Sequence, residues 1–368
     1  MNRRETYLDW NATAPLRPEA VAAMSEALSL CGNPSSVHRR GRAARRLVEQ
    51  SREAVAALVG APVDGVVFTS GGTEANHLAL FGSDRPRVLV SAVEHSSVLD
   101  AVPAAERIPV GHDGRVESAA LAALLDADTR PALVSVMLAN NETGVIQPVR
   151  EIAEIAHAYG ALFHCDAVQA IGKIPVRLAE IDADFLTVSA HKIGGPTGIG
   201  ALIVADGVSI IPLQRGGGQE RNRRAGTENL AGIAGFAAAA SACNVEEHAQ
   251  VRGLRDRLEA GLPPEAIIIG AAAPRLPNTS AIAMQGVPAE TQIIALDLDG
   301  VMVSAGAACS SGKVGPSHVL AAMGIVPDIA NSTIRVSLGW STTEADIAHF
   351  LDVWTALCRR TRGRAKAA

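Results

Sequence analysis

Residues 184–195, DFLTVSAHKIGG, decide the fold of this chain. The first half of this stretch, as far as Val188, is a continuous apolar run with the length and composition of a buried β-strand. Lys192 follows that strand and precedes a glycine-rich stretch that runs to Gly200. One strand earlier, residues 162–166 (LFHCD) end on an aspartate. A lysine and an aspartate therefore stand at the tips of successive strands.

This pair of residues indicates pyridoxal 5'-phosphate (PLP) chemistry. The amine of Lys192 can form a Schiff base with the PLP aldehyde. The carboxylate of Asp166 can keep the pyridine nitrogen protonated, so that the ring accepts electrons. Taken singly, each residue has a simpler explanation, because a lysine after a strand is usually solvated and an aspartate there usually caps a helix. The neighbouring strand ends carry the argument further.

A phosphate cup is predicted at the same edge of the sheet. The strand at 66–69 leads through Gly71 into Gly72 and Thr73, where a helix begins. N–H groups at a helix N-terminus bind phosphate, although an ordinary tight turn is the alternative. Ser189 and His191, with the glycine-rich run 215–227, could complete the cup.

Three more polar residues follow predicted strands. His95, after the strand at 87–91, could stack on the pyridine face and move protons, or could be a structural or capping histidine. Asn141, after the strand at 132–137, could bind the ring oxygen, although a turn is the ordinary explanation of the pair Asn140-Asn141. Gln169, three residues after Asp166, is uninformative alone. Because open α/β sheets bind ligands at the carboxyl ends of their strands, we expect these residues to share one site.

The order of the predicted elements indicates two parts. From about residue 55 to 204, continuous apolar strands alternate with helices, which predicts a mostly parallel sheet covered on both faces. A mixed segment beginning near Pro263 predicts a second, smaller α+β domain that ends in a helix from about residue 344 to 359.

The second part contains a cysteine and an arginine that suggest chemistry. Cys309 lies among small residues (SAGAACSSGKVG, 304–315), which indicates an exposed, mobile loop in which a thiol could attack another group. An incidental surface cysteine is the alternative. Arg335 interrupts an apolar strand and needs a partner, either a substrate carboxylate or a structural ion pair.

Composition excludes several classes of protein. The 368 residues are 48% hydrophobic and 19% charged, which is typical of a globular chain. The net charge of -5 gives no overall basic field for nucleic acid. No apolar run is long enough to span a membrane, and the N-terminus lacks the apolar core of a signal peptide. Five dispersed cysteines without a CxxC pair indicate neither a disulfide framework nor a metal site, so we expect a cytoplasmic protein.

Taken together, the motifs resemble those of the cysteine desulfurases, class V members of the PLP fold type I aminotransferases. The matching runs cover nearly the whole chain and occur in the family's order: YLDWNAT (7–13), GNPSSVH (32–38), FTSGGTE (68–74), NNETG (140–144), DAVQ (166–169), SAHK (189–192), RAGT (224–227) and ACSS (308–311). The long loop around Cys309 resembles that of the mobile-loop group.

The resemblance implies a fold and a domain division. The fold would be α/β, with a mostly parallel seven-stranded sheet in a large PLP-binding domain and a smaller α+β domain. The large domain would span residues 14–250. The small domain, carrying the catalytic cysteine loop, would comprise residues 1–13 and 251–368.

The resemblance also implies a reaction, the conversion of L-cysteine to L-alanine with the sulfur carried as a persulfide on Cys309. Lys192, His95 and Cys309 would be catalytic. The cofactor would be bound by Lys192, Gly72, Thr73, His95, Asn141, Asp166, Gln169, Ser189, His191 and, from the partner subunit of a homodimer, Thr227. The substrate would be bound by Arg335, Asn33 and Asn141. The sulfur would pass to an acceptor protein such as an iron–sulfur scaffold.

Two other functions are compatible with parts of this pattern. A related PLP lyase or transaminase, such as a selenocysteine lyase, would use the same cofactor site. A sulfur-relay or regulatory protein could bind PLP without turnover, but the presence of Lys192, His95, Cys309 and Arg335 together argues against it.

Overall fold

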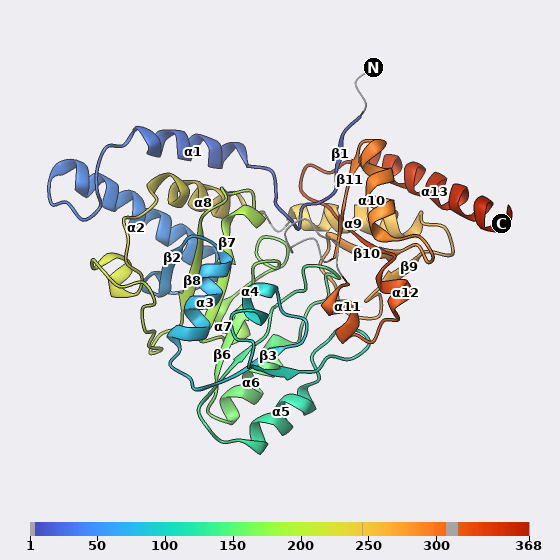
Figure 1. Ribbon diagram of the computed structural model, residues 1–368. Helices are drawn as coiled ribbons and strands as arrows, with labels where there is room; N and C mark the ends of the chain where they lie inside the picture. Colours follow the sequence, from blue (N-terminus) through green and yellow to red (C-terminus); the bar gives the residue numbers. More distant parts are fainter. Residues whose placement is uncertain (1–3, 245, 307–315, 368) are drawn as a thin grey trace.

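A seven-stranded sheet forms the centre of the larger part of the molecule (Figure 1). The computed structural model describes residues 4–244, 246–306 and 316–367. The strands, in spatial order, are β2 (Val66–Thr69), β8 (Gly200–Val204), β7 (Phe185–Ser189), β6 (Leu162–Asp166), β5 (Ala132–Ser135), β3 (Arg87–Ser91) and β4 (Glu106–Ile108). Only β8 runs antiparallel to its neighbours. The predicted mostly parallel sheet is therefore confirmed.

The strands of this sheet are buried on both faces, which explains their continuous apolar composition. In β2, for example, Val66 and Phe68 belong to one hydrophobic cluster, whereas Val67 belongs to another. The covering helices and short turns are α1 (Pro18–Ser29), α2 (Arg39–Val59), η1 (Val63–Gly65), α3 (Gly72–Gly82), α4 (Ser96–Leu99), α5 (Ser118–Ala127), α6 (Val149–Ala158), α7 (Leu178–Ile181), η2 (Ala190–Lys192), η3 (Gln219–Asn222) and α8 (Leu230–Ala242).

A second, smaller α+β unit lies beside the first (Figure 1). Its four-stranded antiparallel sheet has the order β12 (Ser304–Ala305), β13 (Thr333–Ser337), β10 (Thr279–Ala283) and β9 (Ile267–Ile269). Near the N-terminus, β1 (Thr6–Tyr7) pairs in parallel with β11 (Val301–Met302). The helices of this unit are α9 (Glu246–Ala260), α10 (Ala289–Leu298), α11 (His318–Ala322), α12 (Pro327–Ala330) and α13 (Glu344–Ala367).

The last helix continues past residue 359, where the sequence pattern placed its end. The hydrophobic cluster of the smaller unit draws on Leu8 and on residues from Val251 to Cys358. This composition supports the domain division after residues 13 and 250, which remains a prediction. No described helix has the length and apolar character needed to cross a membrane.

The N-terminal segment that follows β1 connects the two units. Trp10 N donates to Ser337 O of β13 at 3.4 Å, and Ala14 N donates to His191 O of η2 at 2.9 Å. Asn11 is therefore held between the smaller sheet and the carboxyl edge of the larger one, where the predicted site residues lie.

Candidate active site

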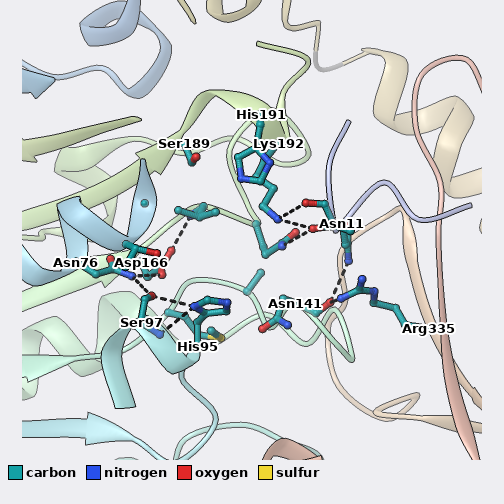
Figure 2. Close-up of a pocket in the computed structure, with 17 residues that line it drawn as sticks. Asn11, Asn76, His95, Ser97, Asn141, Asp166, Ser189, His191, Lys192 and Arg335 are labelled. Atoms are coloured by element: carbon teal, nitrogen blue, oxygen red, sulfur yellow. Dashed lines mark hydrogen bonds between the residues drawn. The ribbon is translucent and has the colours of Figure 1, made fainter. Parts of the chain in front are cut away.

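A cavity of about 330 Å³ opens at the carboxyl ends of the parallel strands, where the N-terminal segment meets the edge of the large sheet (Figure 2). Ten of the predicted site residues line it: Gly72, Thr73, His95, Asn141, Asp166, Gln169, Ser189, His191, Lys192 and Arg335. Five separate strand ends and one strand of the smaller sheet contribute these residues. The fold therefore brings together residues that are far apart in the sequence.

The amine of Lys192 points into the space between the two units (Figure 2). Lys192 ends η2, the short turn that follows β7. Its Nζ donates to the backbone oxygens of Asn11 at 2.6 Å and Ala12 at 2.9 Å. Both acceptors are neutral carbonyl groups, so the amine is oriented at the cavity wall by contacts that do not require it to be charged.

The carboxylate of Asp166, at the end of β6, is buried and held at both oxygens. Its Oδ1 accepts a hydrogen bond from Val168 N at 2.9 Å, and its Oδ2 accepts one from Asn76 Nδ2 at 2.8 Å. The same Asn76 amide donates to Ser97 Oγ at 2.9 Å. Because Asn76 donates to it, Asp166 is kept as an acceptor with a fixed orientation.

His95 serves both as a helix cap and as a cavity residue. Its Nδ1 accepts a hydrogen bond from Ser97 N at 3.1 Å, which caps α4. The imidazole also lines the cavity beside Asp166 (Figure 2). Since Nδ1 is an acceptor, the neutral ring carries its proton on Nε2. The capping explanation and the functional explanation are therefore compatible.

The predicted phosphate cup comes together at the N-terminus of α3. Gly72 and Thr73 begin this 11-residue helix, whose first N–H groups have no acceptor within the helix. A Cβ on Gly72 would lie 3.0 Å from Val168 Cγ2 and 3.7 Å from Ser189 Cβ, so glycine allows close approach here. Burial, with Lys192 and Lys173 nearby, lowers the pKa of His191 to about 4, so this ring is neutral at pH 7.

Arg335 reaches the cavity from β13 of the smaller sheet. Its guanidinium donates to Asn141 O at 3.1 Å and to Asp9 Oδ1 at 2.7 Å. The structural ion pair considered from the sequence therefore exists, with Asp9, and the same arginine also lines the cavity. Its Nε has no hydrogen-bond partner among the described residues although it is buried.

The two asparagines after β5 have different tasks. Asn140 Oδ1 accepts hydrogen bonds from Glu142 N and Thr143 N, both at 2.9 Å, which builds the turn. Asn141 lines the cavity, and its backbone oxygen accepts from Asn11 Nδ2 at 3.2 Å.

These groups fit PLP. The cavity offers helix N–H groups and hydroxyls for a phosphate, a fixed acceptor carboxylate for a pyridinium nitrogen, and a lysine amine for an aldehyde.

Three residues that organise the cavity were not among the predicted site residues. Asn11 binds Lys192, Gln169 and Asn141; Asn76 holds Asp166; and Lys173 donates to Asn11 and Gln169. The helical spacing between Gly72 and Asn76 was the available signal for Asn76, because residues four apart share one face of a helix. Nothing local in the sequence indicated Asn11 as a contact of the cavity.

Two predicted residues do not line the cavity, and a third lies outside the described residues. Asn33, between α1 and α2, is exposed, and its Oδ1 accepts a hydrogen bond from Ser35 N at 2.8 Å. Thr227, between η3 and α8, is also exposed. Cys309 lies outside the described residues. The roles of all three remain predictions.

Comparison with known proteins identifies the family. The family model described as Aminotransferase class-V matches residues 6–350. A cysteine desulfurase of Cereibacter sphaeroides is 47% identical over 94% of both chains. Another relative, "Cysteine desulfurase IscS" of Dictyoglomus turgidum, is 40% identical over 98% of this chain and 96% of its own. The solved structure of a NifS-like protein from Rickettsia africae matches with a TM-score of 0.90 and 36% identity, covering 95% of this chain and 98% of that one. The chain therefore belongs to the class V aminotransferase family, among the cysteine desulfurases.

Proposed function

We propose that this protein is a PLP-dependent cysteine desulfurase that converts L-cysteine to L-alanine and carries the sulfur as a persulfide on Cys309. The observation that carries this proposal is the placement of Lys192, Asp166 and His95 around one cavity with Arg335 facing them from the other unit (Figure 2). These are the groups that PLP chemistry on an amino acid requires, brought together from distant parts of the sequence.

The residues divide the binding of cofactor and substrate among them. Lys192 would hold PLP covalently, Asp166 would pair with its ring nitrogen, and Gln169 and Asn141 would bind near its ring hydroxyl. Gly72, Thr73, Ser189 and His191 would bind the phosphate. Arg335, with Asn141 and Asn33, would bind the substrate carboxylate. Bound PLP supplies an electron sink for the carbon atoms of the substrate.

The sulfur transfer proceeds by attack of a thiolate on the substrate sulfur. The Cys309 thiolate forms the S–S bond as the Cβ–S bond of cysteine breaks. The electron pair of the broken bond remains with Cβ, which takes up a proton and becomes the methyl group of alanine. Lys192 and His95 are the groups at the cavity that can move the protons. The persulfide sulfur then passes to an acceptor protein such as an iron–sulfur scaffold.

We further propose a homodimer in which Thr227 completes the partner's phosphate cup. The loop that carries Thr227 is firmly anchored in its own subunit. Glu220 accepts from Arg52 Nη1 at 2.7 Å and from Phe68 N at 2.8 Å, and Arg224 pairs with Glu74 at 2.7 Å. These contacts support a loop that presents the exposed Thr227 outward.

A cytoplasmic location is part of the same proposal. The described cysteines Cys31, Cys165, Cys243 and Cys358 are free thiols. Free thiols fit a reducing compartment.

One incubation tests the reaction. The protein loaded with PLP should form alanine from L-cysteine in step with sulfide when a reductant is present. Alanine and sulfide are both assayed, because a lyase acting by elimination would give sulfide with pyruvate and ammonia instead. Absence of alanine from a PLP-loaded preparation would refute the proposed function.

A further inference from the structure

Lys173 is a second buried lysine beside the cavity, with no place in the mechanism above. It lies in the turn that follows β6, seven residues after Asp166, and its side chain is almost fully buried. Its Nζ donates to Asn11 Oδ1 at 2.7 Å and to Gln169 Oε1 at 2.8 Å. No described residue forms a salt bridge with it. A buried lysine held only by amide oxygens requires an explanation, because burial without a counter-ion is costly.

The directions of the hydrogen bonds around Lys173 are fixed by backbone carbonyls, which can only accept. Asn11 Nδ2 donates to Asn141 O at 3.2 Å, so the Oδ1 of the same amide must face Lys173. Gln169 Nε2 donates to Asn11 O at 3.0 Å, so its Oε1 must likewise face Lys173. Both amides therefore present their oxygens to the lysine.

This arrangement decides what Gln169 offers to the cavity that it lines. Its oxygen is occupied by Lys173, and one of its two Nε2–H groups is occupied by Asn11 O. The second Nε2–H group is left for a group inside the cavity. If the amide turned over, its oxygen would lie against Asn11 O, and its NH2 group would lie against the donors of Lys173.

We propose that Lys173 is a positioning residue that locks the Gln169 amide, so that Gln169 presents an N–H donor and not a carbonyl oxygen to the ring hydroxyl of PLP. This inference rests on the proposed function, which places Gln169 near that hydroxyl. A donor there stabilises the ionised form of the ring hydroxyl and lowers the pH at which it loses its proton.

The state of Lys173 is compatible with this task. Burial, together with the nearby charges of Lys192 and Arg335, lowers the pKa of Lys173 well below its ordinary value. An uncharged amine still has two N–H groups, one for each of its two acceptors. The other charged groups of the surroundings are Asp9, paired with Arg335, and Asp166, held by Asn76. Arg17 and Glu247, which pair with each other at 2.9 Å, line the same small cavity as Lys173.

The test follows the absorbance of bound PLP as a function of pH, without turnover. Lys173→Met retains an unbranched side chain as far as the Cε position but removes the amine and both donors. We expect the midpoint of the absorbance change to rise by about 0.5 to 1 pH unit, which corresponds to the 3- to 10-fold effect of one hydrogen bond. The dissociation constant for PLP should rise by a similar factor.

Two variants separate this role from a merely structural one. Lys173→Arg retains N–H donors, so its midpoint should lie close to the wild-type value. A cavity of about 30 Å³ that Lys173 helps to line gives the larger side chain some room. Asn278→Ala is the matched control, because Asn278 Nδ2 donates to Asn11 Oδ1 at 3.1 Å and to Leu338 O at 3.0 Å, and no described hydrogen bond joins it to Gln169. Its midpoint should stay at the wild-type value.

Coupling to Gln169 is the deciding measurement. In a Gln169→Ala background, Lys173→Met should produce no further shift of the midpoint. An equal shift in both backgrounds would show that Lys173 acts by another route, for example through Lys192, and would overturn the proposal. If Lys173→Met fails to fold, Lys173→Gln keeps a polar group in the buried site, with its donor one bond short of Gln169, and the same coupling is expected.

The outcomes distinguish this inference from the proposed function. A wild-type protein that does not bind PLP would contradict the proposed function itself. A wild-type protein that binds PLP, with a Lys173→Met variant whose midpoint and affinity are unchanged, would contradict only the role of Lys173.

Discussion

Asn76 Nδ2, on the first turns of α3, lies 2.8 Å from Asp166 Oδ2 at the tip of β6. The helix that begins the predicted phosphate cup is thereby tied to the carboxylate predicted to pair with the cofactor ring. One short helix thus sets the spacing between the two ends of the cofactor site.

Asn76→Ala should weaken PLP binding about 3- to 10-fold and lower the free energy of unfolding by about 1–3 kcal/mol, because a buried carboxylate oxygen loses its donor. PLP titration and urea unfolding measure the two effects. Asn229→Ala is the control: Asn229 caps α8, accepting from Gly232 N at 3.0 Å, so its loss should reduce stability but not PLP affinity. Equal effects of both variants on PLP affinity would contradict a specific role for Asn76.

Lys192→Ala should remove the covalent link to PLP. Treatment with borohydride fixes such a link, and peptide mass spectrometry then locates it. The wild-type protein should carry the label on Lys192, and the variant should carry none, because Lys173 is engaged with Asn11 and Gln169. A labelled Lys173 in the wild-type protein would show that the assignment of the lysine is wrong.

Cys309→Ala should retain PLP and its spectral response to L-cysteine but form no protein persulfide, because only a thiolate can attack the substrate sulfur. Labelled sulfur should appear on Cys309 in the wild-type protein. Cys31→Ala is the matched control, since Cys31 is exposed, whereas burial raises the pKa of Cys243 to about 11 and also raises that of Cys165 well above its ordinary value. A persulfide on Cys31, or undiminished alanine formation by Cys309→Ala, would falsify the proposed route.

Co-expression of two defective chains tests whether Thr227 acts across a dimer. Thr227→Val should weaken PLP binding, and Lys192→Ala should be inactive. In a mixed dimer, one site would combine an intact Lys192 with an intact Thr227 from the other subunit, so about half of the wild-type activity per mixed dimer should return. No recovery in a verified mixed dimer would show that Thr227 serves its own subunit, whereas unchanged PLP affinity of the Thr227→Val homodimer would show that it has no role.

The stability of the protein should fall as the pH is lowered from 6.5 towards 4. Burial lowers the pKa of His164 from 6.5 to about 4; its ring lies between Ser135 Oγ at 2.8 Å and Thr187 Oγ1 at 3.0 Å. The His164 ring binds a proton more readily in the unfolded chain than in the folded one. The contribution of neutral His164 to the free energy of unfolding is therefore complete above about pH 6.5 and is lost below it, by about 2 kcal/mol between pH 7 and pH 5.

In His164→Gln, the free energy of unfolding should fall by about 2 kcal/mol less between pH 7 and pH 5 than in the wild-type protein. Urea unfolding at several pH values measures this difference. A variant slope equal to that of the wild-type protein would exclude His164 as its source.

The sequence by itself determined the sheet and most of the cavity wall. Because strands of a parallel sheet must be apolar on both faces, β7 and β6 can be recognised in the sequence as continuous apolar runs. Their carboxyl ends must lie at one edge of the sheet. Lys192, Asp166, His95 and Gly72 could therefore be assigned to one site from their positions after strands.

The tertiary structure alone decided the contacts between distant segments. Asn11 meets Lys192, Gln169 and Asn141 only because the N-terminal segment passes between the two sheets. The partner of Arg335, the orientation of the Gln169 amide and the burial of Lys173 likewise depend on side chains far apart along the chain. Local periodicity records which face of an element is buried, but not which residue of another element lies against it.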